Sequence, residues 1–108
     1  MGFRMRYRQE GGFSELNSFP GCNQLVISNH SFVFPHLRGL GIGNKNHVVR
    51  LKLMEELGYD YALCTVIETN EAQIRILSNN NWTLLDKFYN KETGNIIRIY
   101  GRSIGDQQ

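Results

Sequence analysis

Residues 33–44 read Val33-Phe34-Pro35-His36-Leu37-Arg38-Gly39-Leu40-Gly41-Ile42-Gly43-Asn44, an apolar run that leads into three glycines at alternate positions. Residues 47–57 follow with the apolar spacing of a helix, with Val49, Leu53, Met54 and Leu57 on the expected core face. A strand, a glycine turn and a helix start favour an anion, because the first N–H groups and the helix dipole point at it. The segment predicts a phosphate-binding turn, in which Arg38 either donates to a phosphate or caps a loop carbonyl.

Two common phosphate-binding fingerprints do not fit this turn. A P-loop needs a lysine and then a serine or threonine directly after its last glycine, where this chain has Asn44 and Lys45. A dinucleotide-binding turn needs the spacing G-x-G-x-x-G, whereas the spacing here is G-x-G-x-G. Lys45 is a second candidate donor to phosphate, and solvation at the surface is the alternative for it.

The pattern that does fit is Pro35-x-x-Arg38-x-x-Gly41-x-Gly43, which resembles the acetyl-CoA pyrophosphate loop of the GNAT superfamily of N-acetyltransferases. Downstream, a second segment looks like that family's Asn-x-x-Ala-x-x-Leu-Tyr…Gly-Phe motif; it reads Asn70-x-x-Gln73-x-x-Ile76-Leu77…Asn81-Trp82. The resemblance covers residues 24–102. It implies an α/β (α+β) fold, with a mixed, mostly antiparallel central sheet and about two helices. It also implies transfer of an acetyl group from acetyl-CoA to a primary amine by direct attack.

The resemblance also implies which residues hold acetyl-CoA. The strand backbone at residues 31–33 would pair with the pantetheine arm, and Asn70 would hydrogen-bond the same arm. Independently, Asn70 has the spacing to Gln73 of a helix cap. The implied cofactor-binding set is Ser31, Phe32, Val33, Arg38, Gly39, Leu40, Gly41, Ile42, Gly43, Asn44 and Asn70.

The residues leave open which group acts as the acid and which as the base. Leu77 stands where the family commonly has a tyrosine that protonates the departing thiolate, and Tyr89 and Tyr100 are possible substitutes. The candidate bases for the amine are Glu68, His30 and, third, His36. Cys64 is a poor candidate for an acyl-carrying nucleophile, because nothing near it in sequence would lower its pKa. An inactive module that binds acetyl-CoA or CoA is the alternative function.

Length and composition indicate one domain, residues 1–108, with a shortened strand and loop at 1–22 and a cofactor-binding core at 23–104. With 41% hydrophobic and 20% charged residues, the chain can form a packed core. A net charge of +2 does not indicate a nucleic-acid or membrane partner. The two cysteines are expected to be reduced, no metal-ligand spacing is present, and the cytoplasm is the expected location.

The remaining elements follow from alternation and turn residues. Strands are expected at residues 3–8, 23–33, 61–67, 82–89 and 96–102, a loop at 10–22, and a second helix from about Asn70 to Ser78. With so short an N-terminal side, the acceptor pocket is expected to be minimal or completed by another subunit. A homodimer is a further possibility, in which the shortened sheet pairs through an exposed edge and the acceptor site is shared.

Overall fold

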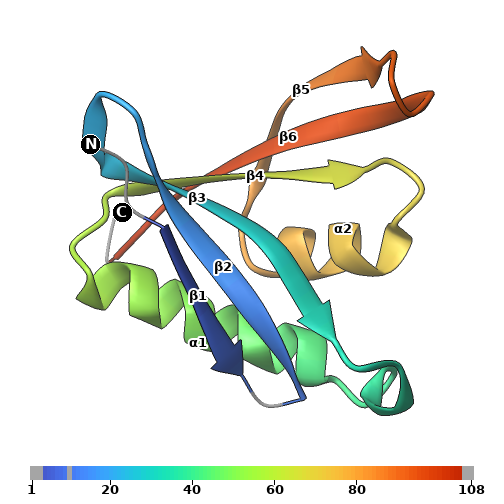
Figure 1. Ribbon diagram of the computed structural model, residues 1–108, viewed down its shortest axis with the longest axis horizontal. Coiled ribbons are helices and arrows are strands. Elements are labelled where there is room, and N and C mark those ends of the chain that lie inside the picture. Colours follow the sequence, from blue (N-terminus) through green and yellow to red (C-terminus); the bar gives the residue numbers. More distant parts are fainter. Residues whose placement is uncertain (1–3, 10, 106–108) are drawn as a thin grey trace.

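The computed structural model describes residues 4–9 and 11–105 of the chain, which form a six-stranded sheet with two α-helices (Figure 1). The elements are β1 (Arg4–Gln9), β2 (Gly12–Phe19), β3 (Cys22–Val33), a 3-10 helix (Pro35–Leu37), α1 (Ile42–Glu56), β4 (Tyr61–Ile67), α2 (Glu71–Asn79), β5 (Thr83–Asn90) and β6 (Asn95–Ser103). The strand order is β1-β2-β3-β4-β6-β5. β3 and β4 run parallel, and every other neighbouring pair is antiparallel. The predicted fold class is confirmed.

The predicted loop at residues 10–22 is wrong, because it contains the strand β2. This strand pairs with β1 on one side and β3 on the other. Its sequence, GFSELNSF, is polar enough to read as a loop, but Ser14, Glu15 and Leu16 are all buried. Hydrogen bonds to two neighbouring strands hold this polar segment extended. Strand identity here is therefore set by pairing across the sheet rather than by local preference.

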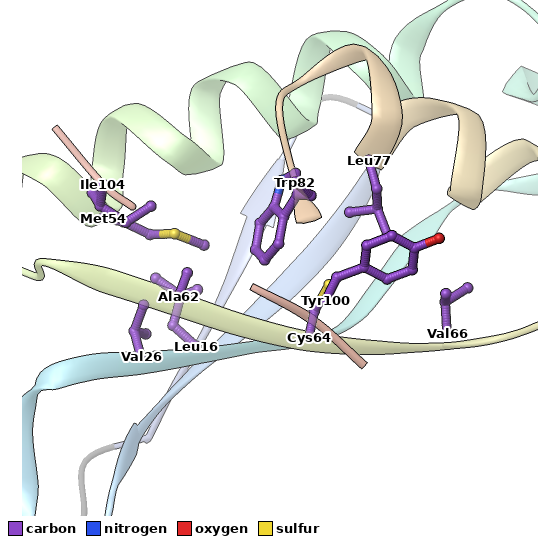
Figure 2. Close-up of a cluster of buried hydrophobic side chains, with 10 residues drawn as sticks. All are labelled: Leu16, Val26, Met54, Ala62, Cys64, Val66, Leu77, Trp82, Tyr100 and Ile104. Carbon is purple, nitrogen blue, oxygen red and sulfur yellow. The ribbon is translucent and has the colours of Figure 1, made fainter. Parts of the chain in front are cut away.

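α1 and α2 lie on the same side of the sheet and enclose the core (Figures 1 and 2). The core comprises Leu16, Val26, Met54, Ala62, Cys64, Val66, Leu77, Trp82, Tyr100 and Ile104. α1 begins at Ile42, five residues before the predicted start. Its expected apolar stripe is wrong at Val49 and Leu57, which are 52% and 45% exposed, whereas Met54 is buried and Leu53 packs against the core. The side chains that α1 buries are Asn46, His47, Arg50 and Met54.

The other side of the sheet carries no helix within the part of the chain that the structure describes. Directly paired residues of a ladder point to the same side, so the register identifies the side chains of this surface. Leu25 pairs with Tyr61, and Ile67 pairs with Ile97, which in turn pairs with Phe88. We call this surface the open face; its apolar members are Leu25, Ile27, Tyr61, Leu63, Ile67, Leu85, Phe88, Ile97 and Ile99.

Candidate functional site: a groove and a cavity that meet at the splayed strands

The glycine turn between β3 and α1 leaves the start of the helix open. Gly39 and Gly41 have φ values of +84° and +80°, a left-handed conformation that favours glycine. A Cβ at either position would meet no atom within 4 Å, so the turn is surrounded by open space. Gly41 is the N-cap of α1, and no side chain caps this end. The N–H groups in the first turn of α1 therefore lack partners within the helix.

A groove of about 630 Å³ lies between this turn and α2. Arg38 from the turn and Arg75 from α2 both line it. Asn80 donates to Asn44 Oδ1 at 2.9 Å and links the two sides. The full lining is Arg38, Gly39, Gly41, Gly43, Asn44, His47, Arg50, Asn70, Ala72, Gln73, Arg75, Ile76 and Asn79. The helix dipole and the arginines together make this groove suited to an anion.

β3 and β4 separate at the inner end of the groove. Within the described chain they pair only at residues 25–27 with residues 61–63, although β3 continues to Val33 and β4 to Ile67. Beyond the last pair, β3 bonds to β2 and β4 bonds to β6. A cavity of about 220 Å³ lies at this divergence; its lining is Ser28, His47, Arg50, Cys64, Thr65, Val66, Ile67, Asn70, Gln73, Leu77 and Trp82. Two parallel strands that part in this way leave a backbone edge facing a cavity.

The structure brings part of the sequence-predicted cofactor set together. The members that line the groove are Arg38, Gly39, Gly41, Gly43, Asn44 and Asn70. Asn70 also caps α2, since its Oδ1 accepts from the Gln73 N–H at 3.2 Å. Leu40 and Ile42 belong to the same turn but are not lining residues. Ser31, Phe32 and Val33 lie in β3 beyond its last pair with β4, and their side chains, like that of His30, lie outside the described residues.

Sequence reasoning missed His47 and Arg50, which line both the groove and the cavity. Each is 2% exposed. Arg50 Nε donates to Ser14 Oγ at 3.0 Å, and Arg50 Nη2 donates to Gln9 Oε1 at 3.3 Å. The available signal was that the polar residues at 46, 47 and 50 also have the helical spacing of one face.

The imidazole of His47 lies between two N–H donors. Trp82 Nε1 donates to Nε2 at 2.8 Å, and Arg50 Nη1 lies 3.1 Å from Nδ1. Indole and guanidinium nitrogens only donate, and a neutral imidazole accepts at one ring nitrogen while it carries a proton on the other. Only one of the two contacts is therefore a hydrogen bond to His47, and protonation of both ring nitrogens would leave neither donor an acceptor. Burial, followed by the charges of Arg50 and Arg102, lowers the pKa of His47 to about 3. His47 is therefore a neutral hydrogen-bond acceptor at the junction of the groove and the cavity.

Cys64 and Leu77 contribute neither a nucleophile nor an acid to the cavity that they line. Burial raises the pKa of Cys64 to about 12, against a smaller lowering by Arg50, so the thiol stays protonated at neutral pH. Leu77 is fully buried. The ring of Tyr100 lies beside it (Figure 2), but the Tyr100 hydroxyl accepts from Arg98 Nη1 at 3.0 Å and does not line the cavity. Tyr89, the second candidate acid, is 58% exposed on β5.

Glu68 is held by two cations at the end of β4. Its carboxylate lies 2.8 Å from Lys87 Nζ and 3.1 Å from Arg98 Nε. Hydrogen bonds from Lys87 and then from Arg98 lower its pKa. Glu68 lines neither the cavity nor the groove, and His36 lies in the exposed 3-10 helix. The ion pairs make Glu68 a weaker proton acceptor than a carboxylate without such partners.

No group of three or more His, Cys, Asp or Glu side chains that could hold a metal ion occurs among the described residues. Within the same residues, neither helix has the length and apolar character needed to span a lipid bilayer.

Several solved structures share this arrangement of strands and helices. yncA from Salmonella typhimurium, determined with its cofactor acetyl-CoA, superposes with a TM-score of 0.77 at 16% identity and covers 90% of this chain. A protein from Desulfovibrio desulfuricans assigned to the GNAT acetyltransferases has a TM-score of 0.77 at 12% identity over 88% of this chain. The NatC complex bound to Gag peptide and CoA contains a chain with a TM-score of 0.77 at 11% identity, also over 88%.

These similarities show the fold. The chain covers 60%, 62% and 62% of the length of those three structures, respectively. No protein-family profile matches the sequence, and no curated protein sequence matches it. The GNAT resemblance inferred from the two sequence motifs is confirmed at the level of the fold.

Proposed function

We propose, on the premise that this chain has the GNAT acetyltransferase fold, that it transfers an acetyl group from acetyl-CoA to a primary amine by direct attack. The observation that carries the proposal is the continuity of the recess. The groove and the cavity share His47, Arg50, Asn70 and Gln73, so the phosphate-binding turn opens onto the gap between β3 and β4. A long ligand with an anionic end and an amide-bearing arm fits such a recess.

The residues that are present fit the two ends of acetyl-CoA. The uncapped start of α1, with left-handed glycines in open space, suits a pyrophosphate, and Arg38 and Arg75 would supply side-chain charge. The unpaired backbone of β3 and β4 suits the amides of the pantetheine arm. Acetyl-CoA supplies the thioester that the amine attacks. The chain would contribute positioning and fixed N–H donors, whose effect is largest where charge develops.

A single displacement, without an acyl-enzyme, is consistent with the chemistry of the cavity. The thiol of Cys64 is protonated, and Leu77 offers no proton. A CoA thiolate is a fair leaving group, so loss of a side-chain acid need not prevent the reaction. Glu68 and His30 remain the candidate bases.

We expect Glu68→Gln to lower the acetylation rate by less than tenfold, because the carboxylate is occupied by Lys87 and Arg98 away from the cavity. A general base is worth roughly 10²–10⁴-fold. The pH dependence of kcat/KM would be compared among wild type, Glu68→Gln and His30→Gln. A loss above 100-fold in Glu68→Gln, with its pH dependence abolished, would assign the base to Glu68.

The proposed function is tested by release of free thiol from acetyl-CoA. A panel of small amines, peptide N-termini and lysine peptides would be incubated with the protein and acetyl-CoA. We expect at least one amine to raise thiol release above the rate seen without protein, with a matching acetylated product by mass spectrometry. Tight acetyl-CoA binding without turnover on any amine of the panel would favour the inactive CoA-binding module.

A further inference from the structure

Leu77 leaves the cavity without an acid at one of its walls. Its side chain is fully buried, lines the cavity and carries no proton that a departing sulfur could take. A sulfur that leaves a thioester without an acid leaves as a thiolate. Positive charge and hydrogen-bond donors both favour the thiolate over the neutral thiol. The groups that line the cavity therefore decide whether a thiolate is stable there.

The cavity has a positive lining. The charged or titratable side chains that line it are Arg50 and His47 from α1 and Cys64 from β4, whereas β3 and α2 contribute the neutral polar side chains Ser28, Asn70 and Gln73. Among the described residues, no Asp or Glu lines either the cavity or the groove. Arg50 is 2% exposed, so salt in the solvent screens its charge only weakly. This lining favours a negatively charged ligand atom.

The same wall holds more N–H groups than its own acceptor can take. Trp82 Nε1 and Arg50 Nη1 both face the imidazole of His47. In either neutral tautomer, the ring N–H of His47 points at one of these donors and not at an acceptor. All three side chains line the cavity. A ligand atom with a lone pair that enters the cavity would accept a hydrogen bond that the three groups cannot give one another.

Cys64 is a thiol that already lies in this cavity, beside Trp82 and Leu77 (Figure 2). Burial raises its pKa, and the charge of Arg50 acts in the opposite direction and lowers it. Cys64 is 8% exposed on a strand of the sheet. A ligand sulfur that enters from the open groove keeps more of its water, so we expect the effect of Arg50 to exceed the effect of burial there.

On the premise of the proposed function, we propose that Arg50, with the N–H groups of His47 and Trp82, stabilises the sulfur of CoA as a thiolate when the thioester is cleaved. In that step the amine nitrogen bonds to the acyl carbon, and the C–S bond breaks with its electron pair on sulfur. The proton of the amine passes to a base or to water, and the thiolate takes a proton from water after it leaves. Arg50 thus compensates for the acid that Leu77 does not supply.

The test compares the binding of CoA with the binding of S-methyl-CoA, whose sulfur cannot ionise. A thiol with a lowered pKa in the complex releases a proton on binding, so its affinity rises with pH. In wild type, the affinity for CoA relative to S-methyl-CoA should rise at least ~threefold between about pH 7 and about pH 9.5, as a pKa lowered by about one unit requires. His47 and Cys64, with pKa values of about 3 and about 12, do not titrate in this range. Calorimetric titration measures both affinities.

Three variants locate the effect. Arg50→Met deletes the charge at similar side-chain length and should remove the rise, whereas Arg50→Lys keeps the charge and should retain part of it. Arg75→Met is the matched control, because Arg75 lines the groove but not the cavity. It should weaken the binding of both ligands equally and leave the rise unchanged. Circular dichroism would confirm that the variants are folded.

Two results would overturn the proposal while the proposed function stands. The first is a relative affinity that stays constant or falls with pH in wild type, which decides the matter even if Arg50→Met does not fold. The second is a folded Arg50→Met that shows the same rise as wild type. A wild type that binds neither ligand at millimolar concentration would instead overturn this proposal and the proposed function together.

Discussion

Replacing Gly41 by glutamate is expected to abolish detectable binding of acetyl-CoA. The substitution places a carboxylate at the N-cap of α1, beside the N–H groups proposed to hold the pyrophosphate. It adds like-charge repulsion and fills the open space above the turn, and the bulky side chain strains a backbone at φ +80°. A loss of at least ~100-fold in affinity, about 2.7 kcal/mol, is expected. Calorimetric titration of acetyl-CoA into both proteins measures it.

Two matched variants separate the effect of a charge in the groove from the effect of backbone strain at a glycine. Gly21→Glu introduces the same side chain at a glycine with φ +82° and no atom within 4 Å of its Cβ, but in the turn between β2 and β3, away from the groove. It should bind acetyl-CoA like wild type. Gly41→Ala introduces backbone strain without charge and should lose only a small part of the affinity. If wild type shows no binding at millimolar acetyl-CoA, the assignment of the groove fails, whatever the variants do.

The second large effect is a loss of stability in acid that depends on His47. The unfolded chain protonates this residue below its ordinary pKa of 6.5, whereas the folded protein resists protonation until about pH 3. Between these values the unfolded state binds more protons, so the free energy of unfolding falls as the pH falls. Over the range from pH 7.5 to 4.5, His47 alone should account for roughly 2–3 kcal/mol.

Urea unfolding of wild type and His47→Gln at several pH values isolates this contribution. The glutamine amide oxygen can still accept from Trp82, but it does not titrate. Wild type should lose more stability than His47→Gln between pH 7.5 and 4.5, by the amount stated above. His36→Gln, at an exposed position, is the control and should keep the wild-type dependence. Identical pH profiles for wild type and His47→Gln would show that His47 is not buried as a neutral group.

The turn and the capped helix could be predicted because their requirements are local. The glycines at 39 and 41 indicate a turn in which the backbone can adopt a left-handed conformation, and Asn70 with Gln73 indicates a helix start. The run Tyr61–Ile67 marks β4 as a strand by its composition, but the expectation that it is buried on both faces is wrong, because alternate residues such as Thr65 and Ile67 are exposed. The turn and Asn70 line the groove, and residues of β4 line the cavity.

The sequence by itself determined the class of fold, the glycine turn ahead of α1 and the cap of α2, because propensity and spacing act within a few residues. Only the tertiary structure decided that polar β2 is a strand, that α1 buries His47 and Arg50, and that both described helices lie on one side of the sheet. Each of these depends on groups distant in sequence. Ser14 lies 36 positions before Arg50, and Trp82 lies 35 positions after His47. A buried polar side chain is stable only when such partners reach it, and partners of this kind leave no local pattern.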